Sequence, residues 1–383
     1  MRNTVIYATG SYTSGRVVGT QELIDEGNLV NEEGQPVPIT QKNLEPIGVL
    51  TRMWANPGEM PSDMGAIALT KCFKSSRVTR QDIGMVITTH NTGDDGDIIP
   101  AISSKVAYKS GLSDVEFFDV IEGCQGWCKA VRIADTLIRN GYNSKIAVVG
   151  AEKLSPIRGR KYSSLLFADG AGAVVLGGID GDEPSGILSS HFGGMSSKHA
   201  ALKMIDSVNA SLASSYTHPV LREMDMDGYG IYEIASRVIP ETFFALIEKY
   251  NVAYGKQLAA DDVKYLLKHQ ASEKILSRSS LNEIRKMLNA GENYRAYLDQ
   301  YRHDKVPNSV KYLGNSSVAT IPTLLDVILK KKVDNPGLED LVTSLKHYAI
   351  VPDDIFAVMS VGAGVGWGGH LIKMHPVYWD NLK

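Results

Sequence analysis

Cys124 is the residue whose type and setting most suggest chemistry. It follows an apolar stretch at 117–121 and precedes a stretch in which apolar side chains recur every three or four residues, as in a helix that Gly141 would end. A cysteine at the N-terminal end of a helix lies near unpaired N–H groups, which favour the reactive thiolate. Most free cysteines are nevertheless small buried apolar side chains. This stretch alone therefore leaves a nucleophile and a core residue equally open.

Two other polar residues occupy comparable positions. His269 follows a predicted strand at 263–267, and Asn315 lies in a glycine turn before a predicted helix at 321–329. Taken singly, His269 could be a core histidine with satisfied ring nitrogens, and Asn315 a residue that the turn requires. Together with Cys124 and a glycine turn near the C-terminus, they are what acyl transfer through a thioester requires.

The remaining polar residues carry weaker signals. The aspartates of the loop at 91–100 could suggest a calcium site, but no glutamate stands at the closing position, so a solvated loop is expected. Asp169 is expected to be structural, fixing a glycine turn. The other histidines lack the spacing of metal ligands, and no metal is expected. They are His90, His191, His199, His218, His303, His347, His370 and His375.

Composition limits the class of protein. The chain has 383 residues, enough for two domains or one duplicated unit, and its net charge of −3 gives no global signature of nucleic-acid binding. No apolar run reaches membrane-spanning length, and the N-terminus does not resemble a signal peptide. The three cysteines, Cys72, Cys124 and Cys128, form no metal-like pair and no even disulfide framework. We expect a cytoplasmic protein without nucleic-acid or membrane partners.

Strands and helices are predicted to alternate along the chain, which favours a layered α/β fold. Three polar segments, at 25–46, 189–226 and 289–307, are interpreted as insertions, the second as a lid or substrate-facing loop. Strands are expected at 5–8, 83–89, 145–150, 263–267, 356–360 and 369–373, with a turn at 10–12. Helices are expected from residue 61, after Cys124, at 239–250 and at 321–329.

Two Gly-Ala-Gly triplets hint at an internal duplication. They begin at Gly170 and Gly362, so they are 362 − 170 = 192 residues apart, about half of the chain. Each is predicted to form a tight glycine turn between two strands. The echo is short and is weak evidence by itself.

The ordered set of motifs resembles the thiolase superfamily, and most of all β-ketoacyl-acyl-carrier-protein synthase III. The matching stretches run from one end of the chain to the other in the family's order. They are 10–12 with 17–18, the turn around Cys124, 167–173, 269–272, 314–317, and 362–364 with 367–368. The resemblance implies a duplicated fold with layers α-β-α-β-α, an N-terminal half at 1–185 that carries the cysteine, and a C-terminal half at 186–383 that carries the histidine and asparagine.

The resemblance also implies roles for single residues. Cys124 would attack an acyl thioester, and the backbone N–H groups of Cys124 and Ala363 would form the oxyanion hole. His269 and Asn315 would hold a malonyl-type thioester while carbon dioxide leaves, and the resulting carbanion would form a carbon–carbon bond. The implied enzyme is a cofactor-independent homodimer that takes acyl-coenzyme A or acyl carrier protein thioesters as substrates.

Departures from the family pattern leave alternatives open. The chain is longer than usual members of the family. The stretch at 43–49 stands where the family has an Asp-Glu-Trp segment, whose tryptophan helps hold coenzyme A. Around Cys124 the sequence is Gly-Cys-Gln-Gly, where the family has Ala-Cys-Ser-Gly. A specialised relative, such as one of secondary metabolism, is favoured. The same acyl-cysteine could instead pass its acyl group to an oxygen or nitrogen acceptor, and a third possibility is a non-catalytic partner subunit. A basic face of Lys268, Lys274, Arg278, Arg285 and Lys286 is interpreted as solvated helix surface, with carrier-protein docking as the alternative.

Overall fold

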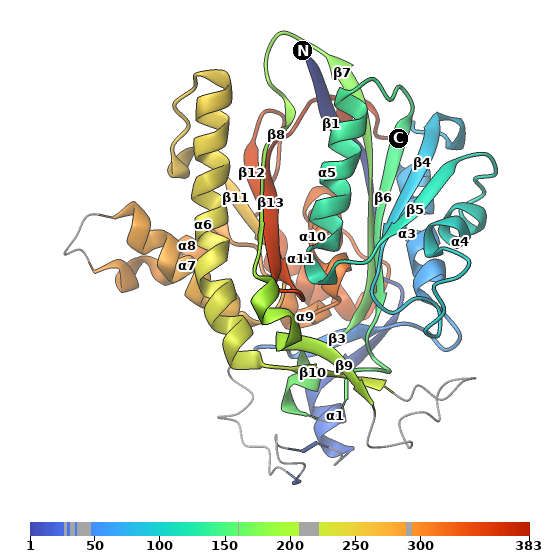
Figure 1. Cartoon of the computed structure of the whole chain (residues 1–383), viewed down its shortest axis with the longest axis vertical. Helices are drawn as coiled ribbons and strands as arrows, with labels where there is room; N and C mark the ends of the chain where they lie inside the picture. The colour runs from blue at the N-terminus through green and yellow to red at the C-terminus, as the bar shows by residue number, and fades with distance from the viewer. Residues whose placement is uncertain (27–28, 31–34, 37–46, 160, 207–221, 289–292) are drawn as a thin grey trace.

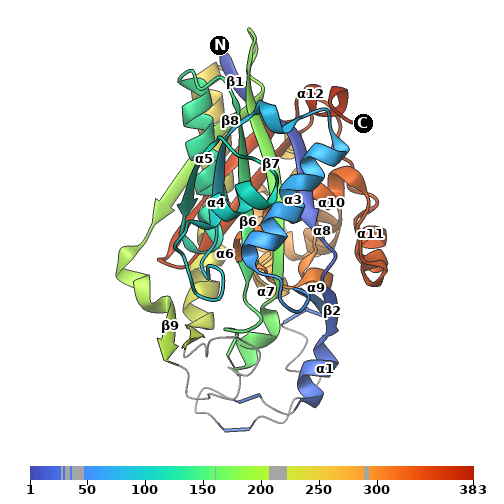
Figure 2. The same ribbon diagram turned by 90° about the vertical axis from the view of Figure 1, so that its right-hand side faces the viewer.

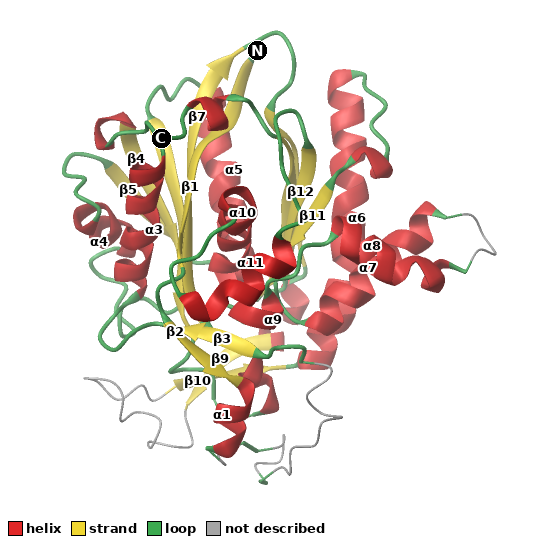
Figure 3. Ribbon diagram, turned by 180° about the vertical axis from the view of Figure 1, so that it is seen from behind, coloured by secondary structure: helices red, strands yellow, loops and turns green. Residues whose placement is uncertain are grey.

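Two β-sheets form the centre of the molecule, with helices between them and on both outer faces (Figure 1). The computed structural model describes residues 1–26, 29–30, 35–36, 47–159, 161–206, 222–288 and 293–383. Within them the layers follow the order helix, sheet, helix, sheet, helix, as seen from front and back (Figures 1 and 3). The layered arrangement predicted from the sequence is therefore confirmed.

The larger sheet is built from the first half of the chain. Its strand order is β1-β7-β6-β4-β5. β4 lies parallel to both β5 and β6, whereas β7 is antiparallel to β6 and to β1. Its strands are β1 (Arg2–Tyr12), β4 (Ile83–Thr89), β5 (Glu116–Val120), β6 (Lys145–Lys153) and β7 (Asp169–Asp180).

The smaller sheet is built from the second half and repeats most of this pattern. Its order is β11-β12-β13-β8, with β11 and β12 parallel and the other two pairs antiparallel. The same spatial order and the same relative strand directions occur in β4-β6-β7-β1 of the larger sheet. We propose on this topology that the chain is a duplicated unit divided near residue 185. The strands are β8 (Gly186–Gly194), β11 (Tyr265–Lys268), β12 (Ile355–Gly362) and β13 (Gly366–Lys373).

Two helices fill the space between the sheets. α5 (Gly126–Arg139) packs on β4, β6 and β13, and α10 (Thr320–Lys330) packs on β1, β7 and β11. α10 is buried on nearly all sides, as its apolar sequence requires of a helix between two sheets. Both lie between the sheets in Figure 1.

The outer faces are covered by helices from the same half of the chain as the sheet they cover. α3 (Pro61–Ser75) and α4 (Ile102–Lys109) cover the larger sheet, and α6 (Gly228–Tyr254) covers β8, β12 and β13 of the smaller one (Figure 2). α7 (Glu273–Met287) packs beside α6, and α8 (Leu298–Lys305) packs against α7. The remaining elements are β2 (Arg16–Gly19), α1 (Thr20–Asp25), β3 (Thr51–Trp54), β9 (Leu202–Asp206), β10 (Arg222–Met226), α9 (Val310–Leu313), α11 (Glu339–Leu345) and α12 (Val377–Asp380).

The first Gly-Ala-Gly triplet corrects one prediction. Gly170 to Gly172 lie inside the continuous strand β7, not in a turn. A Cβ on Gly172 would lie 2.6 Å from the backbone nitrogen of Thr323, so the glycine permits close packing of α10 on the sheet. The second triplet does form a turn, between β12 and β13. Asp169 is buried and accepts hydrogen bonds from the N–H groups of Ala55 and Ser155, so it joins loops instead of fixing a turn.

Other boundaries also differ from the predictions. The expected turn at 10–12 belongs to β1, which is extended through Tyr12. The segment at 189–226 is not an irregular excursion throughout, because its start belongs to β8 and because β9 pairs with β10. The segment at 289–307 contains α8. Most of the predicted insertion at 25–46, and the residues at 207–221 and 289–292, lie outside the described residues.

Candidate active site

Cys124 lies where the larger sheet meets the helix layer between the sheets. It occupies a single 3₁₀ turn, Gly123–Gln125, between the end of β5 and the start of α5. The Ser360 hydroxyl donates to the Cys124 carbonyl oxygen at 2.9 Å, which ties this turn to β12 of the other sheet. The residue is partly exposed, as a nucleophile must be.

The thiol itself differs from the expectation of a resting thiolate. Burial raises the pKa of Cys124 to about 11, although the hydrogen bond from the Ser317 hydroxyl acts in the opposite direction. Cys124 does lie before a helix, as predicted. Desolvation by the surrounding protein nevertheless raises its pKa more than the hydrogen bonds at this position lower it. In the free protein the thiol is therefore protonated near neutral pH.

The turn between β12 and β13 lies directly against the cysteine turn. A Cβ on Gly362 would lie 2.5 Å from the backbone nitrogen of Cys124, and one on Gly123 would lie 2.6 Å from that of Ala363. Gly123 also has a φ of +50°, which glycine adopts readily. Glycine at both positions lets the two backbones approach, so the amide nitrogens of Cys124 and Ala363 come from neighbouring segments.

Asn315 lies in the turn that leads to α10. Its side-chain oxygen accepts from the Ser317 N–H at 2.9 Å, and its amide nitrogen donates to the Ala271 carbonyl at 3.3 Å. The residue is 6% exposed.

His269 directly follows β11, as predicted, and is buried. Its Nδ1 is 2.7 Å from the Thr320 hydroxyl, and that hydroxyl is also 3.0 Å from the Ser317 carbonyl oxygen. Burial lowers the pKa of His269 to about 3, so the ring is neutral near pH 7.

Ser317 joins the three predicted site residues. Its hydroxyl lies 3.3 Å from the Cys124 sulfur, its N–H bonds to Asn315, and its carbonyl accepts from Thr320, the partner of His269. The structure therefore brings Cys124, His269 and Asn315 into one hydrogen-bond network.

Sequence reasoning missed several members of this network. Ser317 and Thr320 were not singled out, although Ser317 stands in the quoted turn. Asn91 and Glu152, which extend the network, follow β4 and end β6. Polar residues at the carboxyl ends of neighbouring parallel strands were the available signal.

Lys268 corrects the predicted basic face. It is fully buried in β11, and its ammonium group is 2.7 Å from the carboxylate of Glu283, which is also fully buried. The other four residues of that face lie exposed on α7: Lys274, Arg278, Arg285 and Lys286.

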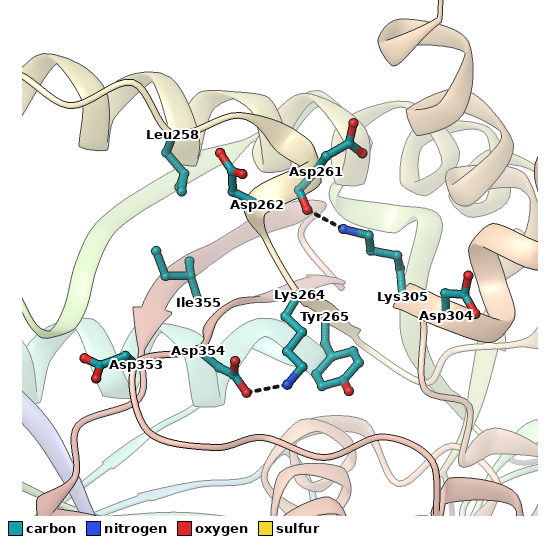
Figure 4. Close-up of a pocket in the computed structure, with 10 residues that line it drawn as sticks. All are labelled: Leu258, Asp261, Asp262, Lys264, Tyr265, Asp304, Lys305, Asp353, Asp354 and Ile355. Carbon is teal, nitrogen blue, oxygen red and sulfur yellow. Dashed lines mark hydrogen bonds and ion pairs between the residues drawn. The ribbon is translucent and has the colours of Figure 1, made fainter.

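A hollow beside the smaller sheet lies away from this network. It has a volume of about 490 Å³ and is located at the starts of β11 and β12 (Figure 4). His269 lies beyond the end of β11. Two of its charged groups have partners: the Lys264 ammonium pairs with Asp354, and the Lys305 ammonium donates to the Asp261 carbonyl. We assign no reaction to this hollow.

In the described part of the chain, no group of three or more His, Cys, Asp or Glu side chains could hold a metal ion. No helix within the described ranges is long and apolar enough to cross a membrane.

Comparisons with known proteins found similar sequences and similar structures. The family model for 3-oxoacyl-[acyl-carrier-protein] synthase III matches residues 118–196, which include the cysteine turn. Over 330 residues the chain is 28% identical to β-ketoacyl-[acyl-carrier-protein] synthase III of Staphylococcus aureus, which covers 85% of this chain and 87% of the relative.

Solved structures agree on the fold. The 3-oxoacyl-[acyl-carrier-protein] synthase III of Aquifex aeolicus matches with a TM-score of 0.74 at 21% identity, covering 97% of this chain and 100% of the other. The priming β-ketosynthase of the R1128 polyketide pathway matches with a TM-score of 0.72 at 22% identity, covering 98% and 97%. The fold is thus thiolase-like.

The chain is a distant homologue of the β-ketoacyl-acyl-carrier-protein synthase III enzymes, and these similarities support a synthase III-like acyltransferase.

Proposed function

We propose that the protein loads an acyl group onto Cys124 and condenses it with a malonyl-type thioester. The observation that supports this most is the network in which Ser317 connects Cys124, Asn315 and, through Thr320, His269. A nucleophile and two polar groups able to hold a thioester carbonyl are the parts that this reaction needs.

In the first half-reaction, the Cys124 sulfur attacks the carbonyl carbon of an acyl thioester. The N–H groups of Cys124 and Ala363 stabilise the oxyanion, a contribution of about 10²–10³ in rate per donor in other enzymes. The bond to the carrier sulfur then breaks, and the carrier leaves as a thiol that carries the proton lost by Cys124. The high thiol pKa requires this proton transfer to accompany the attack.

In the second half-reaction, His269 and Asn315 hold the thioester carbonyl of a malonyl-type substrate. The Thr320 hydroxyl has one hydrogen, which it donates to the Ser317 carbonyl in this structure. The neutral His269 ring can donate from Nε2 to the substrate when that hydrogen turns from the Ser317 carbonyl to Nδ1. These donors stabilise the enolate as carbon dioxide leaves. The carbanion attacks the acyl carbon, a carbon–carbon bond forms, and the Cys124 thiolate departs.

The test is intact-protein mass spectrometry with a panel of acyl thioesters on coenzyme A and on carrier protein, followed by addition of malonyl thioesters. We expect an acyl mass gain that is lost in Cys124→Ala, and carbon dioxide release when product forms. Product formation by Cys124→Ala at the wild-type rate would refute the nucleophile. An acyl-enzyme that forms an ester or amide without carbon dioxide would instead establish transfer to an oxygen or nitrogen acceptor.

We also propose a specialised substrate and a homodimer. The departures from the family pattern at 43–49 and around Cys124 support the first. The second is supported by β5, whose partner in the described sheet is β4 alone, and by Phe117 and Ile121 near this edge, which are 51% and 54% exposed. Light scattering should give a dimer for the wild type and for Val252→Lys, a change of an exposed apolar residue on α6, but a monomer for Phe117→Lys/Ile121→Lys. If the double variant is still a dimer, the β5 edge is not the dimer interface.

We propose that the substrates of both half-reactions are thioesters of acyl carrier protein or of coenzyme A. The four exposed basic residues of α7 fit an acidic carrier protein.

A further inference from the structure

A buried hydrogen-bond chain leads from a carboxylate to the candidate nucleophile. Glu152 is 0% exposed, and its Oε2 accepts from the Asn91 side-chain nitrogen at 2.5 Å. The same nitrogen is 3.2 Å from the Ser317 hydroxyl, which is 3.3 Å from the Cys124 sulfur. The chain crosses from β6 of the larger sheet to the turn before α10.

The direction of each bond in this chain can be assigned from the carboxylate outward. An ionised carboxylate only accepts, and Oε1 of Glu152 already receives hydrogen bonds from the Thr92 N–H and hydroxyl at 3.2 and 2.7 Å. Asn91 must therefore turn its NH₂ group toward Glu152. Its second N–H then donates to the Ser317 oxygen, which leaves the single Ser317 hydrogen for the Cys124 sulfur.

The backbone of Ser317 is held in an unusual conformation for this purpose. Its φ is +51°, in the left-handed region that serine seldom adopts. Bonds to Asn315 and Thr320 hold its N–H and its carbonyl. Backbone strain of this kind persists where the surroundings fix it, commonly at functional sites.

We propose that Glu152, Asn91 and Ser317 are positioning residues, forming a hydrogen-bond chain of fixed direction that presents a donor to the Cys124 sulfur. The inference rests on the proposed role of Cys124 as nucleophile and adds residues that the family resemblance did not supply. A charge-assisted donor stabilises the thiolate, both when Cys124 attacks and when it departs as leaving group.

Other titratable groups face this chain. His90 precedes Asn91 and bonds to Asp119. Burial raises the pKa of Glu152, and the hydrogen bonds from Thr92 and Asn91 oppose that rise. Asp169 and Lys153 are cross-strand neighbours beside Glu152. His370 of β13 contacts the Cys128 carbonyl on α5, next to the cysteine turn, and Glu122 and Lys129 form an ion pair at the start of that helix.

Charge and hydrogen bonding make opposite predictions for one substitution. The negative charge of Glu152 by itself raises the pKa of the thiol, so removing that charge should lower it. In Glu152→Gln, however, the amide that replaces Oε2 donates to Asn91, Asn91 turns its oxygen toward Ser317, and the Ser317 hydrogen is diverted from the sulfur. The proposal therefore requires that Glu152→Gln raise the thiol pKa.

The experiment measures the rate of iodoacetamide alkylation at Cys124 between pH 6 and 11 by peptide mass spectrometry. Cys72 and Cys128 are fully buried, and burial raises the pKa of each to about 12, so they should not compete; Cys124→Ala confirms the assignment. We expect Ser317→Ala to raise the apparent pKa by about one unit, equivalent to a roughly tenfold slower reaction at pH 8. Glu152→Gln and Asn91→Ala should shift it in the same direction.

Ser316→Ala is the matched control, because its hydroxyl faces Gly170 of β7, and it should alkylate like the wild type. Thermal unfolding of each variant separates this effect from loss of structure. A lowered or unchanged pKa in folded Glu152→Gln would overturn the chain. Alkylation needs no acyl substrate, so it tests the hydrogen-bond chain independently of the proposed function. If the alkylation rates follow the expectation but Cys124→Ala still forms product, only the proposed function is refuted.

Discussion

Two fully buried glutamates show how differently the two halves of the molecule treat a carboxylate. Glu283 lies behind β11 and is paired with the Lys268 ammonium, which also donates to the hydroxyls of Ser279 and Ser280. Glu152 lies at the site and accepts hydrogen bonds from neutral groups of Asn91 and Thr92. The ion pair of Glu283 with Lys268 holds two elements together. The Glu152 carboxylate instead determines which way the hydrogen-bond donors of Asn91 and Thr92 point.

The largest effect should come from breaking the pair. Lys268→Met leaves Glu283 without its cation in the interior, and we expect a loss of about 3–5 kcal/mol in the free energy of unfolding. Urea denaturation measures it. Lys264→Met, which breaks a partly exposed pair with Asp354, is the control and should cost about 1 kcal/mol or less. An equal loss in both variants would contradict the comparison, and Lys268→Met/Glu283→Leu should recover most of the stability.

A second test uses pH. Burial lowers the pKa of His269 to about 3, whereas an unfolded histidine has a pKa of about 6.5. Below pH 6.5 the unfolded chain binds a proton that the native ring does not, so stability falls with pH until about pH 3. Inside this window the slope from His269 is about 1.4 kcal/mol per pH unit. His269→Asn should remove that part of the slope in urea denaturation at pH 7, 6, 5 and 4.5, and an unchanged slope would show that the native ring is protonated.

The smallest effect on stability is expected at the site. Glu152→Gln keeps the volume and an acceptor for Thr92 while removing a buried charge, so the free energy of unfolding should change by no more than about 1 kcal/mol. Glu283→Gln strands the buried Lys268 charge and should approach the cost of Lys268→Met. Urea denaturation of Glu152→Gln and Glu283→Gln measures both losses of unfolding free energy. Similar losses in the two variants would contradict the difference between the two glutamates.

The sequence was sufficient for several of the central strands and helices. Apolar periodicity located β4 at 83–89 without error, and it located the helix after Cys124 and the strand before His269. These signals are local, because side chains that face a core repeat with the period of their own element.

The failures concern contacts between distant segments. Lys268 resembled a surface residue because its partner Glu283 lies on another element. Gly172 resembled a turn residue because the helix that requires its missing side chain begins about 150 positions later. The role of Ser317 depends on Asn91 and Glu152, which only the parallel pairing of β4 with β6 brings together.

The facing glycines have a consequence for how this site differs from the family pattern. Gly123 and Gly362 each leave room for the backbone of the opposite turn, and a Cβ on Gly123 would lie 2.6 Å from the Ala363 nitrogen. The family pattern has alanine where this chain has Gly123, so a chain with that alanine must hold its two turns further apart. The spacing between the Cys124 and Ala363 amides is therefore set by this chain's own glycine.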